Sequence, residues 1–332
     1  MADIVFAGSV QRLTVLEKKN GEFRVARTAF EGTQVNACAS DPASGAVFVG
    51  TAKGLYKSTD AGATWTDLCD EVDGQPVVSL HVNRQTHRLM IGTHPIELYL
   101  SDDLGGNVRK VGFVPRIPAE IRDKWMFHPL PAYGPHVKSL ASGPGALVVN
   151  IEEGWGYRSD DDGDTWKLMR RGLHIDAHVL APHPDDPQTI FSTHAFGLVR
   201  SRDGGETWID TGVSDFGIKD YGGGVAVNPS DPDVVLFSTG VQRVFAQAVK
   251  GAASKIFRTE DGGDSWHQVT RGLPEEIPGR MEALLFDHDE HNPCAYAMTD
   301  TGDLFEGKNG GTEWRVAARG LGSLYMYAAA VL

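Results

Sequence analysis

The sequence predicts an all-β protein, a seven-bladed propeller that occupies residues 1–332 as a single domain. Three observations lead to this prediction. A turn motif, S-x-D-x-G-x-T-W, recurs along the chain, short β-rich runs flank its copies, and the two chain ends look like complementary parts of one further unit. Repeated four-stranded units of this kind are typical of propellers.

The turn motif is complete in four places, which are residues 58–65, 159–166, 201–208 and 259–266. The series is completed by two incomplete copies, 101–105 and 307–311, and by one very degenerate copy that ends at 20–23. The aspartate and hydroxyl side chains of such a turn hydrogen-bond its own backbone, and the glycine supplies a positive φ. We therefore interpret the motif as structural, and its acidic residues are not candidates for catalysis.

The units contain four short strands each, which we call A to D. In one unit they fall at residues 223–228, 234–239, 255–259 and 266–270. Residues 3–26 look like strands B, C and D without a strand A, whereas 323–332 look like a strand A with nothing after it. Pairing of these ends would complete the seventh blade and cover the edges that an open array exposes. The C-terminal strand is therefore expected to close the ring.

Strand alternation assigns the loops to two faces. The A–B turns and the motif turns share one face, and the B–C loops and D–A links share the other, which we call the top face. The two longest stretches between motif copies lie within 113–136 and 241–254, both on the top face. Because long ordered loops are usually functional, we expect them to wall a pocket there, and we expect no site on the lower face. Neutral variation in loop length is the alternative.

The 113–136 stretch also carries aromatic side chains among five prolines, including Trp125, Phe127 and Tyr133. Such side chains suit stacking on a sugar ring or an apolar substrate. They equally suit a small apolar core that fills the mouth of the channel.

Polar residues gather on the predicted top face, at the starts of A strands and in B–C loops, where side chains converge on the central axis. They are His94, His136, Glu152, His178, His194, Arg280 and Glu282. Imidazoles together with a carboxylate suit Zn²⁺ or another divalent metal. His94, His178 and His194 are therefore the predicted ligands of a Zn²⁺, Mn²⁺ or Ca²⁺ ion.

The remaining members of this group are the predicted catalytic residues, namely His136, Glu152, Arg280 and Glu282. Imidazole and carboxylate side chains transfer protons, and Arg280 is expected to hold an anionic group of the substrate. A metal-free polar pocket, or histidines that only hydrogen-bond their loops, are the alternatives. His81 lies within a strand and is given no role.

Charge and composition exclude several classes of partner. The chain has 31 Lys and Arg against 44 Asp and Glu, a net charge of −13, which disfavours nucleic acid. Its three cysteines show no CxxC spacing, so neither a disulfide framework nor a thiolate zinc site is supported. The N-terminus lacks signal-peptide features, and no apolar run approaches the roughly 20 residues that span a bilayer. We expect a cytoplasmic protein without a membrane partner.

The repeated motif is the Asp-box, or BNR motif. With four complete copies, the chain resembles the bacterial BNR-repeat, sialidase-like propeller proteins (WD40-YVTN-BNR-like repeats) along essentially its whole length. Sialidases of that superfamily would need an arginine triad, a Tyr/Glu pair and an Arg-Ile-Pro motif in the first blade. Here Arg116-Ile117-Pro118 lies in a mid-chain insertion, and sialidase propellers have six blades, so sialidase activity is not expected.

The sequence thus predicts an enzyme, hydrolase- or lyase-like, that acts on a small polar or carbohydrate-like molecule at the top opening. The 113–136 loop would wall its pocket, and the histidines and Glu152 would bind a metal or transfer protons. The alternative is a non-catalytic propeller that binds a ligand or a partner protein on the same face. The fold alone does not separate these two functions, because propellers host both.

Overall fold

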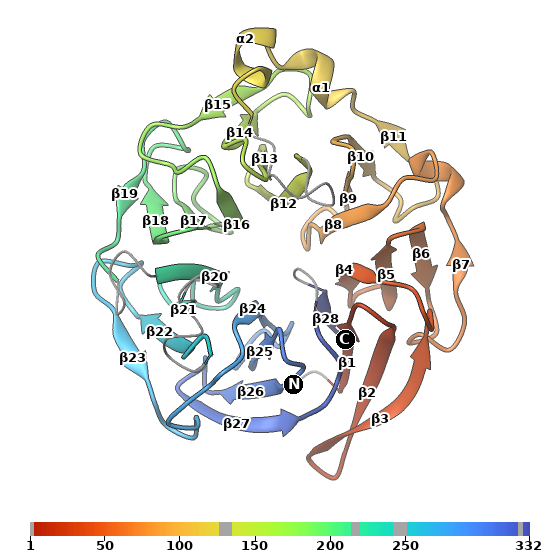
Figure 1. The fold of residues 1–332 in the computed structure, drawn as a ribbon, viewed down its shortest axis with the longest axis vertical. Helices are drawn as coiled ribbons and strands as arrows, with labels where there is room; N and C mark the ends of the chain where they lie inside the picture. The colour runs from red at the N-terminus through yellow and green to blue at the C-terminus, as the bar shows by residue number, and fades with distance from the viewer. Residues whose placement is uncertain (1–2, 126–134, 214–219, 242–250, 325–327) are drawn as a thin grey trace.

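The computed structural model describes residues 3–125, 135–213, 220–241, 251–324 and 328–332. Within these residues, seven four-stranded antiparallel sheets stand as blades around a central axis (Figure 1). The fold is a seven-bladed β-propeller, as the repeats predict. The innermost strand of each blade lies nearest the axis and the fourth strand lies at the rim.

The blades are numbered here from the N-terminus, with their strands given from the axis outwards. Blade 1 is β28 (Ala329–Val331), β1 (Ile4–Gly8), β2 (Leu13–Lys19) and β3 (Glu22–Ala29). Blade 2 is β4 (Val35–Asp41), β5 (Ala46–Thr51), β6 (Gly54–Ser58) and β7 (Thr66–Asp67). Blade 3 is β8 (Val77–Val82), β9 (Leu89–Thr93), β10 (Leu98–Ser101) and β11 (Arg109–Lys110).

Blade 4 is β12 (Val137–Gly143), β13 (Ala146–Ile151), β14 (Gly156–Ser159) and β15 (Lys167–Met169). Blade 5 is β16 (Ala177–Pro182), β17 (Ile190–His194), β18 (Gly197–Ser201) and β19 (Ile209–Asp210). Blade 6 is β20 (Asp220–Val227), β21 (Val235–Val241), β22 (Lys255–Thr259) and β23 (His267–Val269). Blade 7 is β24 (Met281–Phe286), β25 (Ala295–Thr299), β26 (Leu304–Lys308) and β27 (Glu313–Ala318).

Pairing of the two chain ends closes the ring, as predicted. Strand β28 runs antiparallel to β1, with Phe6 opposite Ala330 and Val5 opposite Val331. The register continues to the last residue, because the amide of Leu332 donates to the carbonyl of Ile4 at 3.0 Å. The first blade is therefore held by hydrogen bonds between the beginning and the end of the chain.

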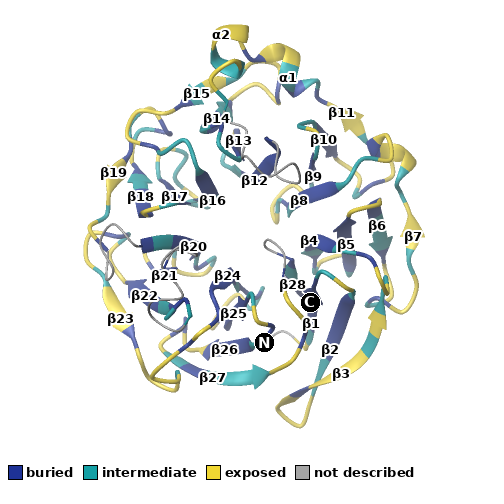
Figure 2. Cartoon of the chain, viewed as in Figure 1, coloured by how far each residue is buried: buried dark blue, intermediate teal, exposed yellow. Residues whose placement is uncertain are grey.

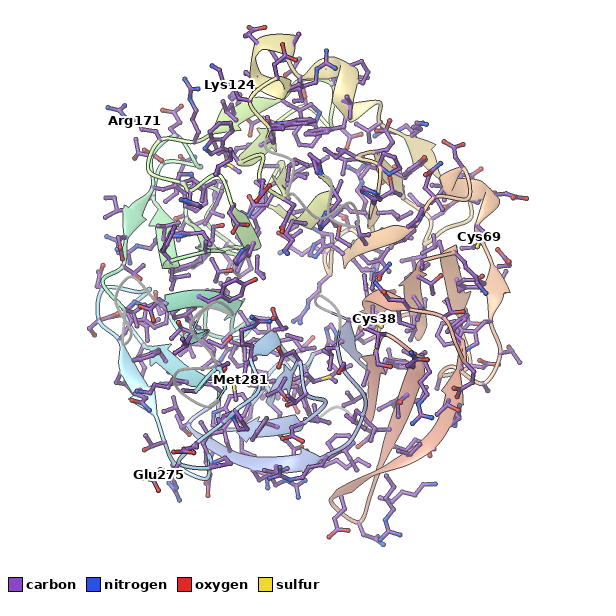
Figure 3. The ribbon with its side chains drawn as sticks, viewed as in Figure 1. Cys38, Cys69, Lys124, Arg171, Glu275 and Met281 are labelled. Carbon is purple, nitrogen blue, oxygen red and sulfur yellow. The ribbon has the colours of Figure 1, made fainter. Side chains whose placement is uncertain are left out.

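The apolar core lies between blades. Inner strands are buried and outer strands are largely exposed (Figure 2). In Figure 3, Cys38 on β4 and Met281 on β24 lie on innermost strands, whereas Cys69, Lys124, Arg171 and Glu275 lie nearer the rim. Each core cluster joins neighbouring blades; for example, Phe191 of blade 5 packs with Phe237 of blade 6. Because two blades share each cluster, no blade buries its apolar faces alone.

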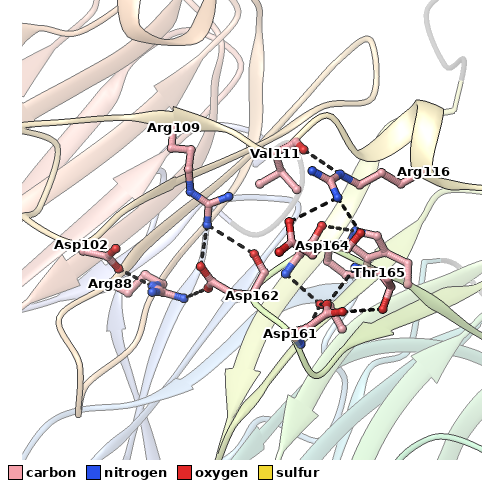
Figure 4. Close-up of polar contacts among 12 residues, drawn as sticks. Arg88, Asp102, Arg109, Val111, Arg116, Asp161, Asp162, Asp164 and Thr165 are labelled. Atoms are coloured by element: carbon pink, nitrogen blue, oxygen red, sulfur yellow. Dashed lines mark hydrogen bonds and ion pairs between the residues drawn. The ribbon is translucent and has the colours of Figure 1, made fainter.

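In the repeated turns, the Ser, Thr and Asp side chains of the motif form hydrogen bonds within the turn itself. In the 159–166 copy, Ser159 donates to Asp161 at 2.8 Å, and the amides of Gly163 and Thr165 donate to these two side chains, both at 2.8 Å (Figure 4). Hydrogen bonds from Thr165 and Ser159 lower the pKa of Asp161 to about 2. The carboxylate is thus an ionised part of the turn, as the structural interpretation predicts.

Neighbouring blades are also joined by a repeated polar contact that the sequence analysis missed. In every blade, a basic side chain donates to a carbonyl in the motif turn of the next blade, at 2.5–3.3 Å. The pairs are Arg27 with Ala61, Lys57 with Leu104, Arg109 with Asp162, Arg158 with Gly204, Arg200 with Gly262, Arg258 with Gly310, and Arg315 with Gly21. We call these the inter-blade basic contacts; the one from Arg109 appears in Figure 4.

The source of the basic residue follows a simple rule. In blades 2, 4, 5 and 6 it is the residue just before the motif Ser or Thr, on the third strand. In blades 3 and 7 that position holds Leu100 and Glu306, and the residue paired with it on the fourth strand, Arg109 or Arg315, makes the contact instead. The two positions are cross-strand neighbours, so either can reach the next turn.

The 113–136 stretch does not wall the top face where it is described. Residues 113–125 form α1 (Phe113–Arg116) and α2 (Ala119–Arg122) at the outer rim between blades 3 and 4 (Figure 1). Phe113 and Ile117 are buried there against Tyr157, and Trp125 donates to the Tyr157 hydroxyl at 2.7 Å. These side chains are buried at the rim, so residues 113–125 do not form the expected pocket wall. Phe127 and Tyr133, like most of the 241–254 stretch, lie outside the described residues.

One further short element belongs to the described fold. A short 3-10 helix, η1 (Asp70–Val72), lies in the link between blades 2 and 3. None of the helices in the described ranges has the length and apolar character that a membrane span requires.

Candidate functional site

A β-bulge recurs near the top end of the innermost strands. The register shifts within β4, β8, β12, β16, β20 and β24, at the equivalent place in each. A bulge re-aims a side chain and is common next to functional sites. In blades 4, 5 and 7 the bulge holds charged or titratable residues, Lys138, His178 and Glu282. The residues two positions earlier are also polar: His136, Asp176 and Arg280.

In blade 4 the bulge residue forms a largely buried ion pair. Lys138 Nζ lies 2.9 Å from Glu152 Oε2, and the Glu152 amide donates to the His136 carbonyl at 3.0 Å. Burial raises the pKa of Glu152, but the charges of Lys138 and His178 outweigh it and lower that pKa overall. Glu152 is therefore an ionised carboxylate at neutral pH.

In blade 5 the bulge histidine is held from both sides. His178 Nε2 lies 3.2 Å from Asp176 Oδ1, and its Nδ1 lies 2.9 Å from the Gly222 carbonyl of blade 6. Burial lowers the pKa of His178, but Asp176 outweighs it and raises that pKa. The pKa of Asp176 is lowered despite burial, chiefly by His178. The pair is an imidazolium bound to a carboxylate, since both ring nitrogens face acceptors.

Blades 6 and 7 continue the series through Tyr221. Its ring lies 4.7 Å from the His178 ring and 5.0 Å from the Arg280 guanidinium, measured to the ring centroids. Arg280 Nε donates to Glu282 Oε1 at 2.9 Å and its Nη2 to Asp300 Oδ2 at 3.2 Å. Burial lowers the pKa of Arg280, but Glu282, Tyr221 and Asp300 outweigh it and raise that pKa.

Two further histidines, His174 and His194, flank this series. The His174 and His194 rings stack with centroids 5.8 Å apart, and His174 Nδ1 accepts from the Asp176 amide at 3.1 Å. His194 Nδ1 likewise accepts from the Phe196 amide at 3.1 Å. Burial, followed by the charges of His174 and His178, lowers the pKa of His194 to about 4. A neutral imidazole with an accepting Nδ1 carries its proton on Nε2, so His194 is a hydrogen-bond donor at neutral pH.

The seven predicted residues fall into two groups of contacts, with His94, His136 and Glu152 in blades 3 and 4, and His178, His194, Arg280 and Glu282 in blades 5 to 7. His94 joins the first group through an edge-to-face contact with His136, at 6.2 Å between centroids. The charge of His178 acts on Glu152 between the two groups. We call the whole group the top-face cluster; it comprises His94, His136, Lys138, Glu152, Asp176, His178, His174, His194, Tyr221, Arg280, Glu282 and Asp300. Sequence reasoning missed Lys138, Asp176 and Tyr221. For Lys138 and Asp176 the only signal is an i, i+2 spacing of polar residues at the starts of A strands, and Tyr221 has no such signal.

The role predicted for Arg280 gains no support from its contacts and stays a prediction. Arg280 was expected to hold an anionic group, but the buried guanidinium is already bound by the carboxylates of Glu282 and Asp300. Two anions at hydrogen-bond distance neutralise the charge that a substrate anion would need.

The described residues also show no arrangement of ligands that would support the metal prediction. In the portion of the chain that the structure describes, no three His, Cys, Asp or Glu side chains are grouped so that they would hold a metal ion. His178 uses both ring nitrogens within the protein, and His194 uses its Nδ1. A metal-bound imidazole needs one unprotonated nitrogen that is directed at the ion. Metal binding by His94, His178 and His194 stays a prediction.

The fold and the cluster together define this chain as a seven-bladed β-propeller with a charged polar site at one end of its axis. No family model matches the chain, and no curated protein matches it. Its likeness to solved structures is confined to the fold, because the identities are low.

An ancestral GH74 enzyme matches with a TM-score of 0.62 at 17% identity, over 85% of this chain and 38% of the enzyme. This chain thus spans about two fifths of that enzyme. YCF48 from Cyanidioschyzon merolae matches with a TM-score of 0.59 at 14% identity, over 89% of this chain and 93% of the other. A structure of YCF48 bound to D1 peptide gives a TM-score of 0.58 at 13% identity, over 90% of both chains. The solved structures that share this fold therefore include an enzyme and a protein bound to a peptide.

Proposed function

We propose that this chain is a ligand-binding propeller of the Asp-box (BNR-repeat) kind, which holds a neutral, polyhydroxylated, sugar-like molecule at the top-face cluster. The observation that carries this proposal is a set of three carboxylates with a common arrangement. Glu152, Asp176 and Asp300 each contact a buried cation and keep 20%, 27% and 24% of their side-chain surface exposed. They come from blades 4, 5 and 7, around one end of the axis.

This arrangement suits hydroxyl donors. An ionised carboxylate has about four acceptor sites, and its cation partner uses only part of them. The carboxylates of Glu152 and Asp176 are fixed in place, because their partners Lys138 and His178 are themselves buried. Adjacent hydroxyl groups of a sugar can donate to such oxygens, with charge-assisted hydrogen bonds worth about twice a neutral one. The neighbouring His194 offers a donor for a ring or hydroxyl oxygen.

Hydrolase- or lyase-like turnover is the second candidate. It is favoured by the His178 imidazolium and the ionised carboxylates of Asp176 and Glu152. The imidazolium is a possible general acid, and the two carboxylates are possible general bases. Against it, glycoside hydrolysis by two carboxylates requires one of them to be protonated, and the pKa values of both Glu152 and Asp176 are lowered. Both ring nitrogens of His178 are also occupied. We therefore rank binding above turnover by His136, Glu152, Arg280 and Glu282.

The experiment is saturation-transfer NMR with neutral gluco-, galacto- and xylo-oligosaccharides, with released reducing ends measured in the same samples. The test variant is Asp176→Asn, which keeps the shape and removes the charge. Asp231→Asn is the matched control, because Asp231 is exposed in an A–B turn on the lower face. Binding by at least one sugar should weaken at least tenfold in Asp176→Asn and stay unchanged in the control, since hydrogen bonds to charged groups contribute about 1.5–3 kcal/mol.

The possible results separate the candidates. Binding without new reducing ends supports the ligand-binding proposal, and release of reducing ends that Asp176→Asn abolishes supports turnover instead. Absence of any sugar binding would refute both. Adding Zn²⁺, Mn²⁺ or Ca²⁺ to freshly purified protein tests the metal prediction, because a bound ion should raise the melting temperature of the native chain but not of His94→Ala.

A further inference from the structure

The lower end of the axis contains a cavity of about 480 Å³, on the face where the sequence led us to expect no site. The ends of the innermost strands of blades 3 to 7 line it, from His81 in blade 3 to Phe286 in blade 7. Its size lies within the range of small-molecule sites, about 300–1,000 Å³. The top-face cluster lies at the opposite ends of the same strands, so the two sites are separate.

The wall of this cavity is divided by chemistry. Blades 4 to 7 supply mainly apolar side chains, among them Leu140, Leu180, Pro182, Leu285 and Phe286. Blade 3 supplies the polar part, His81 to Gln85, and Ser142 of blade 4 lies beside it. A ligand that fills the cavity would meet a polar wall on one side and an apolar wall on the other.

Most polar side chains of the blade 3 wall already have partners in the protein. Asn83 Nδ2 donates to Ser142 Oγ at 2.7 Å, and His81 Nε2 lies 3.2 Å from the same oxygen. The Ser142 amide also approaches His81 Nε2, at 3.4 Å, so this nitrogen accepts and the ring is neutral. Burial, followed by the charge of Arg84, lowers the pKa of His81 to about 4. His81 therefore carries no charge at neutral pH.

Arg84 differs from its neighbours because most of its donors are unused. It extends from the A–B turn of blade 3 across the axis to blade 7, where Nη2 donates to the Phe286 carbonyl at 3.3 Å. This is one of the five N–H donors of a guanidinium. Asp287 lies near enough to attract it, but the Asp287 carboxylate accepts from the amides of Asp289 and Cys294. Arg84 is also solvent-accessible, so its free donors can meet a ligand.

Among the described residues that line the cavity, one side chain besides Arg84 is charged. Asp185 lines the mouth of the cavity from blade 5, but it is exposed and its charge is screened by water. The pKa of His288, which feels the charge of Arg84, is lowered to about 3 by burial first and then by Arg84, so that ring is neutral too. Arg84 is therefore the only basic side chain among the described residues that line the cavity.

We propose that this lower cavity binds a small monocarboxylate with an apolar body, whose carboxylate pairs with Arg84 and whose body lies against the apolar wall of blades 4 to 7. A guanidinium matches a carboxylate in a bidentate geometry. The apolar wall distinguishes such a ligand from an inorganic anion, and the charge distinguishes it from an alcohol of equal length. The proposal is independent of the sugar site at the top face.

The test uses hexanoate as the probe, with 1-hexanol and inorganic phosphate as comparisons, each titrated into the full chain and followed by NMR. Hexanoate should bind at least tenfold more tightly than either comparison. Arg84→Gln should weaken hexanoate at least tenfold, and Arg84→Lys should weaken it less. Arg24→Gln is the matched control, because it removes the same charge from an exposed position on β3 and should leave binding unchanged.

A second variant guards against a folding defect in Arg84→Gln. Leu285 lines the cavity and is only partly buried, so Leu285→Gln should be tolerated and should weaken hexanoate without creating binding of phosphate. Asp176→Asn, at the top face, should leave hexanoate binding intact. The proposal is overturned if the native chain does not bind hexanoate, if 1-hexanol or phosphate binds equally well, or if both cavity variants bind like the native chain.

Discussion

Replacing Arg258 by methionine is expected to destabilise the whole ring by removing one inter-blade basic contact. Arg258 is 5% exposed on β22, and its Nε donates to the Gly310 carbonyl of blade 7 at 3.0 Å. Methionine keeps much of the aliphatic packing of the arginine stem but has no donor. The substitution therefore tests the polar contacts and not the loss of volume. It also removes the ion pair of Arg258 with Glu260, whose side chain is 65% exposed, so that this pair contributes little.

The expected magnitude follows from the burial of both partners. Gly310 is buried, so its carbonyl would lose its donor without full access to water. Leaving a buried acceptor unsatisfied costs about 1–3 kcal/mol, and we take about 2 kcal/mol. For a chain of 332 residues the unfolding entropy near the midpoint is about 0.7 kcal/mol/K. The melting temperature should therefore fall by about 3 °C.

The assay is thermal unfolding followed by circular dichroism and scanning calorimetry. Arg271→Met is the matched control, because the Arg271 side chain is 75% exposed and its ion pair with Glu313 at 3.5 Å is a surface pair. It should shift the midpoint by less than about 1 °C. Arg258→Lys should recover most of the loss, because Lys57 makes the same contact with Leu104 at 2.6 Å in blade 2.

Two results would refute this reasoning. If Arg258→Met has the same melting temperature as Arg271→Met, the contact contributes nothing to stability and the ring depends on apolar packing between blades alone. If Arg258→Lys is as unstable as Arg258→Met, the loss arises from guanidinium packing and not from the donated hydrogen bond.

The other predictions concern ring closure and acid stability. Deleting residues 329–332 should lower the free energy of unfolding by about 4 kcal/mol or more, because it unpairs β1, and should promote self-association, because it uncovers the edge of β1. Thermal melting and size-exclusion chromatography check these two results. An unchanged melting midpoint would contradict the prediction. His194 is buried with its pKa lowered to about 4, so between pH 6.5 and 4 the unfolded chain binds a proton that the folded chain excludes, and stability falls as the pH falls. His194→Gln should remove about one proton, or about 1.4 kcal/mol per pH unit, from that slope in urea titrations; an unaltered slope would mean that His194 is protonated in the folded state.

The arrangement of the site was partly predictable from the chain. Strand alternation alone placed His94, His136 and Glu152 at the same end of the axis, and the structure brings them together. Their partners were less predictable, because the direction of a side chain at a bulge depends on how two strands slip against each other. Lys138 and Asp176 were missed for that reason. The partners of Arg280 were not predictable either, because one of its two carboxylates, Asp300, lies 20 residues away in the chain.

The sequence by itself determined the architecture. Three features can be recognised in the sequence without knowledge of the fold. They are the period of the turn motif, the turn residues between strands and the complementary ends of the chain. They set the number of blades, the closure between β28 and β1, and the two faces. A repeat in which every unit must bury its face on the next allows few other solutions.

Only the tertiary structure decided how the charges are used and where space remains. Arg84 meets Phe286 across the axis although the two are 202 positions apart, and no local pattern links them. The helices after Phe113 turned outward because their apolar side chains find cover between blades 3 and 4. A repeat sequence specifies contacts between neighbouring units, whereas the axis and the rim bring together residues whose separation in the chain has no fixed period. The lower cavity therefore could not be predicted from the sequence repeats, although strands of those repeats line it.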